Sequence, residues 1–369
     1  MKILLFIDNP SQDSLYTFWA KALRKLGHEV IYFEQMPVLY AQPWLAKSNI
    51  LRKICQWGLR EKHLWGIRQI WPIKIAAPLI IGAQNKMNKK FIETARTLKP
   101  QLIIVLKGLG IYPKTLLNIK LVTDSVIVNF NGDDPHNLFS SNQNVIDSLA
   151  VYDHVFTWSK MLVKRLTDDG ATRVHYLPFA ADADVYKGCE NPTAEERKMY
   201  GSDIVFVGTG DPERKSELES LSDLDLGIWG PYWDRNCKKS HLMARLRGGR
   251  IDVNTMAKVY RSSKVVLNLM REQNFSSHNM KTFEIPSIGA FMLAPRTSEH
   301  ADFFEEGKDI ACYGSAHELR EKAIYFIAHD AERAAMAKSA HEKTLRYHTY
   351  IQRMTELLRL IALEQPPRA

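Results

Sequence analysis

Glu284 is the first residue whose surroundings suggest chemistry. It stands in the stretch HNMKTFEIPSIGAFMLAPR, residues 278–296, where a proline and then a glycine limit the helix around it to about two turns. A polar loop, residues 274–279, precedes this helix and leads into its first free amides. The Glu284 carboxylate could accept two hydrogen bonds from a cis-diol, and Arg271 and Lys281 could neutralise a diphosphate. The alternative is an ordinary exposed glutamate on a helix.

A glycine turn is the second candidate. Gly208-Thr209-Gly210 follows an apolar run and precedes a helix that opens at Asp211. Such a turn can present backbone amides to a phosphate at the positive end of a helix, with Arg214 and Lys215 as countercharges. Glu213 stands where the third glycine of a dinucleotide-binding fingerprint would be, so a plain tight turn remains the alternative.

The stretch NFNGDDPHN supplies the third candidate, with Asp133, Asp134 and His136 at the end of an expected strand. Two neighbouring aspartates suit a general base whose pKa is raised by the adjacent charge, and they also suit a pair of metal ligands. A purely local function is equally open, because an aspartate before Pro135 can close an Asx turn.

The elements that position these residues alternate along the chain. In the first half, continuous apolar runs predict strands, and helical spacing predicts the segments between them. The strands are expected at 2–8, 28–34, 101–108, 124–132, 154–159 and 173–180, and the helices at 12–26, 113–119, 145–150 and 160–169. Runs of Val, Ile and Leu without a period of two indicate strands covered on both faces, hence a parallel sheet.

The pattern lapses at residues 178–192 and then restarts. Strands are expected at 202–210, 224–230, 264–270 and 290–294, with helices at 211–221, 253–263 and around Glu284. The sequence therefore predicts an α/β protein with two doubly wound, Rossmann-like domains facing across a cleft, where ligands bind beyond the carboxyl ends of the strands. We expect domains at 1–180 and 200–347, a linker at 181–199, and a closing helix and tail at 348–369.

Composition narrows the class of protein. A chain of 369 residues with 45% hydrophobic residues tends to divide into two domains. Its four cysteines are far apart, which favours neither a disulfide framework nor a zinc site and suits a reducing cytoplasm. The apolar start is too short for a signal peptide, and the longest apolar run is too short to span a bilayer. We expect a cytoplasmic protein.

The positive charge is concentrated in residues 41–99. This segment holds twelve Lys or Arg against two Glu, a net charge of +10, and four of the eight tryptophans: Trp44, Trp57, Trp65 and Trp71. Bases interleaved with aromatics suit an anionic membrane surface or a nucleic-acid backbone, but no nucleic-acid motif accompanies them. We predict peripheral contact with the inner face of a membrane. The alternative is a solvated helical excursion with inward-facing tryptophans.

From about residue 203 to 358, the sequence resembles the C-terminal domain of GT-B glycosyltransferases, and more narrowly the CgeB-like, spore-maturation-protein-like branch. The resemblance rests on VFVGTGDPERKSELESL, IWG, KVVLNL, the stretch around Glu284, FFEEGKDI and the closing HTY helix. It implies a nucleoside diphosphate sugar as donor substrate, no cofactor and no metal. It also implies a helix from Tyr350 that crosses back to the first domain.

Carried over residue by residue, the resemblance assigns the Gly208–Gly210 turn and Arg214 to the donor diphosphate and Glu284 to the donor ribose. Trp229-Gly230 and the loop 247–251 fall where related enzymes enclose the nucleotide base. Arg271, Asn279 and Lys281 complete the expected donor site.

Two departures from the family pattern bear on the mechanism. The residue eight positions before Glu284 is Ser276 rather than a second glutamate, and Thr209 stands where an arginine often follows the first glycine. The sequence therefore leaves both retention and inversion of configuration open. An inverting enzyme needs a general base in the first domain, for which Asp133, Asp134 and His136 are the candidates; Lys107-Gly108 and Asp8-Asn9 are further acceptor-side candidates.

Three functions remain open from the sequence. The first is transfer of a sugar to a cell-envelope, lipid-linked or protein acceptor. The second is 2-epimerisation of a nucleotide sugar on the same fold. The third is a non-catalytic, coat-associated module that binds nucleotide sugars.

Overall fold

The structure is a computed structural model that describes residues 1–8, 14–40, 71–137, 140–185, 191–238, 240–271, 274 and 276–363, with the backbone alone for 37, 39, 40, 71–80 and 363. The chain forms two compact units. Unit 1 comprises Met1–Pro178 and Met354–Ala369, and unit 2 comprises Phe179–Arg353. The expected basic, tryptophan-rich segment lies outside the described residues as far as residue 70, and the side chains of 71–80 are also outside them.

Unit 1 is built on a six-stranded parallel sheet in the order β2-β1-β3-β4-β5-β6. Its strands are β1 (Lys2–Ile7), β2 (Glu29–Glu34), β3 (Leu102–Leu106), β4 (Val126–Asn131), β5 (His154–Thr157) and β6 (Val174–Tyr176). Every residue of β3 is buried, as expected for a strand covered on both faces. The doubly wound sheet predicted from the apolar runs is confirmed.

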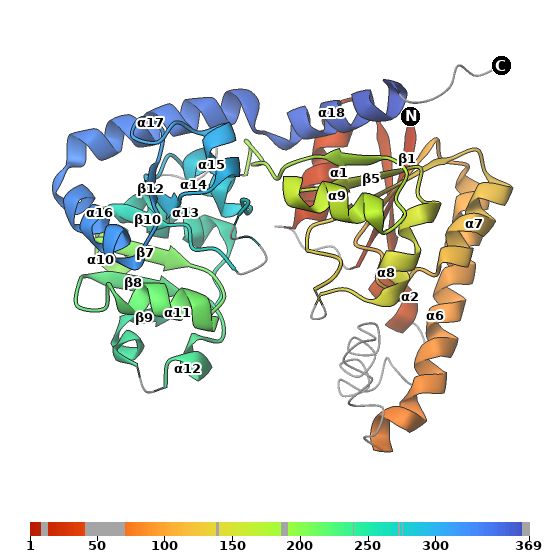
Figure 1. Cartoon of the computed structure of the whole chain (residues 1–369), viewed down its shortest axis with the longest axis horizontal. Coiled ribbons are helices and arrows are strands. Elements are labelled where there is room, and N and C mark those ends of the chain that lie inside the picture. Colours follow the sequence, from red (N-terminus) through yellow and green to blue (C-terminus); the bar gives the residue numbers. More distant parts are fainter. Residues whose placement is uncertain are drawn as a thin grey trace. The chain divides into compact units, whose positions relative to one another are not determined.

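The helices of unit 1 connect these parallel strands (Figure 1). They are α1 (Leu15–Lys25), α2 (Gln35–Tyr40), α6 (Trp71–Leu98), α7 (Pro113–Val122), α8 (Gln143–Asp147) with the 3-10 turn η1 (Leu149–Val151), and α9 (Lys160–Asp168). The 28-residue α6 buries Met87 and Phe91 and exposes Lys86, Lys89 and Lys90. The described part of the basic segment is thus an amphipathic helix that packs on unit 1.

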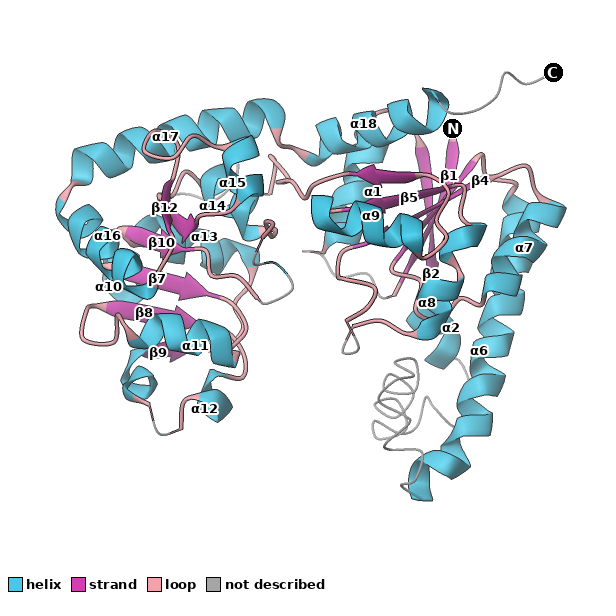
Figure 2. Cartoon of the chain, viewed as in Figure 1, coloured by secondary structure: helices cyan, strands magenta, loops and turns pink. Residues whose placement is uncertain are grey.

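Unit 2 repeats the plan with a second six-stranded parallel sheet, in the order β12-β11-β10-β7-β8-β9 (Figure 2). Its strands are β7 (Ile204–Val207), β8 (Leu226–Trp229), β9 (Leu246–Gly248), β10 (Val265–Leu267), β11 (Met292–Pro295) and β12 (Ala311–Tyr313). Its helices are α10 (Ala194–Tyr200), α11 (Pro212–Glu219), α12 (Trp233–Asn236), η2 (His241–Arg245), α13 (Val253–Ser262), α14 (Lys281–Ile288), α15 (Ser298–Phe303), α16 (Ala316–Ala328) and α17 (Asp330–Tyr347).

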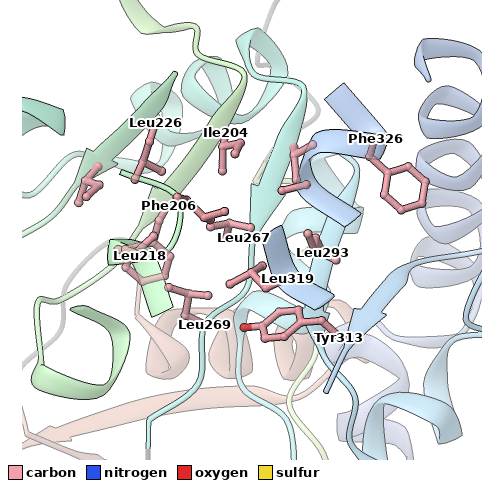
Figure 3. Packing of buried hydrophobic residues seen from close by; sticks show 14 of the residues in the cluster. Ile204, Phe206, Leu218, Leu226, Leu267, Leu269, Leu293, Tyr313, Leu319 and Phe326 are labelled. Atoms are coloured by element: carbon pink, nitrogen blue, oxygen red, sulfur yellow. The ribbon is translucent and has the colours of Figure 1, made fainter. Parts of the chain in front are cut away.

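The core of unit 2 lies between its sheet and the helices on one face (Figure 3). Ile204, Leu267 and Leu293 from three adjacent strands are buried together with Leu319 of α16 and Phe326 at its end. Fully burying one such side chain contributes roughly 1.5–3 kcal/mol. This packing fixes the strands whose carboxyl ends carry the candidate residues.

The last helix, α18 (Tyr350–Leu363), begins in unit 2, and its residues from Met354 onward belong to unit 1. The expected return of the closing helix to the first domain is therefore confirmed at the level of the chain. Within unit 2, Arg353 Nε donates to the Phe179 carbonyl at 3.2 Å, and Ala181 pairs with Thr349. The two segments by which the chain enters and leaves unit 2 are thus hydrogen-bonded to each other.

Candidate functional site

The topology of unit 2 places two loops at its switch point. From β7 the chain winds outward to β8 and β9, then returns to β10 on the other side of β7. Ligands in such sheets bind at the carboxyl ends of the two strands where the winding reverses. The segments there are the turn 208–210 after β7 and residues 268–271 after β10. The sequence-predicted donor residues therefore lie on the edge of the sheet that this topology favours.

The glycine turn is closely packed against the end of β8. Gly208 N donates to Trp229 O at 2.9 Å and Gly210 N to Pro231 O at 3.0 Å. The indole of Trp233 donates to Gly208 O at 2.9 Å. Two of the three turn amides are thus committed to protein carbonyls, and Thr209 has the one turn amide without a hydrogen bond among the described residues. The predicted phosphate contact of this turn stays a prediction, carried by Thr209.

Gly230 explains why the turn can pack so closely. Its φ of +138° is a conformation that side chains rarely allow, and a Cβ there would lie 1.9 Å from Gly208 O. Trp229 packs near Tyr200 with ring centroids 6.0 Å apart, and its buried Nε1 has no hydrogen-bond partner. Gly248 lies against the Trp229 ring, because a Cβ there would come within 2.7 Å of it. The expected base wall, Trp229-Gly230 and the loop 247–251, is thus packed together.

The Arg214 side chain lies between the loop after β7 and the loop after β10. Its guanidinium donates to Thr209 O and to Leu269 O, both at 3.1 Å, and lies 3.3 Å from Asp211. Burial lowers the pKa of Arg214, while the charge of Asp211 raises it. The side chain therefore joins the loop after β7 to the loop after β10. Its predicted contact with the donor diphosphate stays a prediction.

Asp211 and Arg271 lie beside this bridge. Asp211 caps α11 by accepting from the Arg214 amide at 3.0 Å. Burial raises the pKa of its carboxyl, and the hydrogen bond and charge of Arg214 oppose that rise. Arg271 Nε is 3.7 Å from Asp211, but 46% of the Arg271 side chain is exposed. Among the predicted diphosphate cations, Arg271 is therefore the most accessible.

Glu284 is not an ordinary exposed glutamate. Its carboxylate lies 2.8 Å from Lys281 Nζ, and only 15% of its side chain is exposed. Lys281 also lies over the Tyr260 ring, 5.6 Å from its centroid. Burial alone would lower the pKa of Lys281, but the charges of Glu284 and Tyr260 raise it above its usual range. The pair is therefore largely buried, with 25% of the Lys281 side chain and 15% of the Glu284 side chain exposed.

A network of polar side chains stabilises the start of the short helix around Glu284. The sequence predicted a polar loop there but not these hydrogen bonds. Thr282 N donates to the Asn279 side chain at 3.2 Å, and Asn279 Nδ2 donates to Asn268 at 2.8 Å. The Thr282 hydroxyl lies 2.9 Å from His300 Nε2. Burial lowers the pKa of His300 to about 4, so its imidazole is neutral. Asn279 thus caps α14. The signal for Asn268 was a polar residue at the end of an apolar strand.

Gly289 ends α14 in the left-handed conformation, with φ +82°. Pro286 lies inside the helix and has no amide to donate to the preceding turn. Both features predicted from the sequence are present.

In unit 1, Asp133 lies at the carboxyl end of β4. Its carboxylate is 2.8 Å from Lys107 Nζ, and Lys107 follows β3 with a left-handed φ of +70°. Burial raises the pKa of nearby Tyr16, and the charges of Asp8 and Asp133 raise it further. The structure thus brings Asp133 together with both weaker acceptor-side candidates, Asp8 and Lys107.

Asp134 and His136 are directed differently. His136 N donates to Asp134 Oδ1 at 2.9 Å, which is the Asx turn considered above. Arg165 donates to the other Asp134 oxygen at 3.3 Å, and His136 Nε2 lies 2.9 Å from Asp169. Their carboxylate and imidazole thus connect the loop to α9. The catalytic assignment of all three residues stays a prediction, with Asp133 the best placed.

Among the residues that the structure describes, no group of three His, Cys, Asp or Glu side chains is arranged to hold a metal ion. Within that same part of the chain, no helix combines the length and apolar character needed to cross a membrane.

Comparison with known proteins shows what this site is similar to. The sequence model of the family described as "Glycosyl transferase-like" matches residues 214–359. The match covers less than half of the chain. The Spore protein CgeB of Bacillus subtilis is 22% identical over 201 residues, which cover 49% of this chain and 59% of CgeB. The alignment therefore leaves more than a third of CgeB's own length unmatched.

Solved structures agree over the whole chain. Anabaena HepE in complex with UDP and glucose matches with a TM-score of 0.63 at 12% identity, over 98% of this chain and 100% of HepE. The trehalose-6-phosphate synthase OtsA matches with a TM-score of 0.66 at 12% identity, over 100% of both chains. The predicted GT-B fold and the resemblance to CgeB are confirmed, and the residues matched by the glycosyl transferase-like family include Arg214, Arg271 and Glu284.

Proposed function

We propose that this protein is a glycosyltransferase that moves a sugar from a nucleoside diphosphate sugar to a cell-envelope, lipid-linked or protein acceptor. The observation that carries the proposal is the partly accessible Glu284, paired with Lys281 in a short helix that follows the carboxyl end of β10 and lies within the residues matched by the glycosyl transferase-like family. HepE, of similar fold, is described in complex with UDP and with UDP-glucose. Both facts favour a nucleotide-sugar donor.

The geometry of unit 2 supports three donor contacts. Glu284 would accept hydrogen bonds from two ribose hydroxyls, since a carboxylate has lone pairs for both and one oxygen is already fixed by Lys281. Arg271 and the Thr209 amide would bind the diphosphate. Arg214 would hold the loops on which these groups stand.

The reaction needs a base for the acceptor and countercharge for the leaving group. In the inverting form, Asp133 removes the proton of the acceptor hydroxyl as its oxygen attacks the anomeric carbon, and the nucleoside diphosphate leaves with the electrons of the broken bond. Lys107, 2.8 Å away, orients the Asp133 carboxylate. Arg271 and the Thr209 amide would stabilise the leaving diphosphate, which is why we propose metal-independent transfer.

We further propose that unit 1 contacts an anionic membrane surface. Lys86, Lys89, Lys90 and Arg96 lie on the exposed side of α6, and each basic residue near such a surface contributes about 1 kcal/mol. Flotation with anionic liposomes should recover the protein, and neutral liposomes should not. Equal partitioning would remove this part of the proposal.

The primary test is calorimetric titration with a panel of nucleoside diphosphates and their sugars. One nucleotide should bind to the wild type, and Glu284→Ala should weaken it at least about tenfold, the loss expected for hydrogen bonds to a charged group. Glu342→Ala is the matched control, because Glu342 is an exposed glutamate on α17 of the same unit. Unchanged affinity in Glu284→Ala would refute the donor site. Product analysis separates transfer from 2-epimerisation, since an epimer formed without acceptor indicates the latter.

A further inference from the structure

Unit 2 has a second concave surface, which lies at the edge of the sheet opposite the donor residues. It is a cavity of about 630 Å³ bounded by α10, the ends of α13 and α14, and the first half of α17. Lys264, which lines it, immediately precedes β10, and Phe291, which also lines it, immediately precedes β11. Figure 2 shows β7 and β8 running away from the side of α10. This amino-edge cavity is therefore separate from the carboxyl ends that carry Glu284.

The lining of the amino-edge cavity is strongly basic. It includes four cations, from α10, α13, the loop after α13 and α17: Arg197, Arg261, Lys264 and Arg333. The one carboxylate of the lining, Asp330, pairs with Arg333, and Lys264 pairs with Asp203 at 2.9 Å. Arg197 makes no ion pair or side-chain hydrogen bond within the described chain. A positive potential thus remains after the internal pairs are formed.

Ser262 adds an independent polar feature. It lines the cavity, and its buried hydroxyl has no hydrogen-bond partner. Buried polar atoms are normally satisfied, so this hydroxyl beside the cavity is a hydrogen-bond donor that no described protein group uses. The hydroxyl can donate to an anionic oxygen.

Helix capping does not account for these features. Arg261 Nε donates to Ile288 O at 3.3 Å, at the end of α14. The negative end of the helix dipole therefore accounts for the presence of Arg261. Neither Arg197 nor the Ser262 hydroxyl takes part in that contact. A cavity volume in the range of small-molecule sites, combined with arginines from separate helices, instead matches recognition of phosphoryl oxygens.

We propose that the amino-edge cavity binds a phosphorylated small molecule, with Arg197 and Arg261 on the phosphoryl oxygens and the Ser262 hydroxyl donating a further hydrogen bond. The site is separate from the donor site and does not depend on the proposed transferase activity. Its volume admits a sugar phosphate or a compound of similar size.

The test is calorimetric titration with two probes, inorganic pyrophosphate and glucose 6-phosphate. Arg197→Gln and Ser262→Ala should each lower the affinity about tenfold, because each removes a hydrogen bond to a charged group. Arg346→Gln, at an exposed arginine elsewhere on α17, should bind like the wild type.

Ser262→Ala also separates a ligand contact from a structural contact. Because the hydroxyl is unpartnered in the protein, its removal should leave the melting temperature unchanged or raise it, while the affinity falls. Wild-type affinity in both Arg197→Gln and Ser262→Ala would overturn the proposal. So would loss of binding in Arg271→Gln alone, which would place the probes at the donor edge, or absence of binding at millimolar concentration.

Discussion

Substitution of Gly230 by alanine should destabilise unit 2 through the glycine turn. The added Cβ would lie 1.9 Å from Gly208 O, which is itself held by the Trp233 indole at 2.9 Å. Relief of the clash must therefore move the end of β7 or of β8. A non-glycine residue in such a backbone conformation costs about 1–3 kcal/mol, and overpacking a well-packed site costs about 1–3 kcal/mol more.

The expected loss for Gly230→Ala is thus about 2–6 kcal/mol, or roughly 4–24 °C in melting temperature for a unit of this size. Scanning calorimetry and nucleotide titration on the same samples measure both effects. Gly249→Ala is the matched control, since a Cβ at Gly249 meets nothing within 4 Å, and its stability should stay within about 0.5 kcal/mol of the wild type. A Gly230→Ala protein as stable as Gly249→Ala would refute the packing argument.

Three further outcomes are expected. Asp133→Asn should lower kcat by about 100-fold or more, as loss of a general base does, and should leave donor affinity unchanged. Asp134→Asn should mainly lower stability, because its carboxylate closes the Asx turn. The opposite pattern in steady-state kinetics would exchange their roles. His300 has a folded pKa of about 4 against 6.5 unfolded, so its contribution of about 3 kcal/mol is complete above pH 6.5 and is lost as the pH falls toward 4. Urea midpoints from pH 7 to 4.5 should fall less steeply in His300→Gln, and identical slopes would contradict this. A double-mutant cycle on Lys281→Met and Glu284→Gln should give a coupling of about 1–3 kcal/mol in unfolding free energy, and a value near zero would show that the pair is not coupled.

Much of the architecture was predictable because apolar runs and helix caps are local signals. The strands that frame both switch points, β1, β3, β7 and β10, were all expected near their observed positions. The short strands β9 and β12 were missed, since three residues each carry too little pattern to distinguish them from loops. Most of α10 lies within the predicted linker 181–199, and its Glu196 pairs with Lys258 of α13. The polar composition of this segment gives no signal for an ion pair between residues 62 positions apart.

The candidate residues were predictable by place but not by partner. Their sequence positions after strands put Glu284, Arg271 and Asp133 beyond the carboxyl ends of β10 and β4, because parallel strands end together. Which of the cations face a ligand depends on contacts 50 or more positions apart, such as Arg214 with Leu269 O, and no local pattern encodes them.

The distribution of hydrogen bonds at the unit 2 switch point has a consequence for specificity. Arg214, Asn279 and two of the three turn amides are already bonded within the protein, so they hold the loops at little further entropic cost when a donor binds. The groups left for a ligand are few: the Arg271 guanidinium, the Glu284 carboxylate and the Thr209 amide. Arg214 holds the loops that position these few groups, so a substitution of Arg214 should change the affinity for every nucleotide alike. A substitution of Glu284 should lower the affinity only for nucleotides with a ribose cis-diol. Measuring the affinity for ribose and 2′-deoxyribose diphosphates in both variants distinguishes a residue that supports the loops from one that contacts the ligand. A loss of affinity in Arg214→Met that is confined to the ribose forms would show that Arg214 itself contacts the ribose.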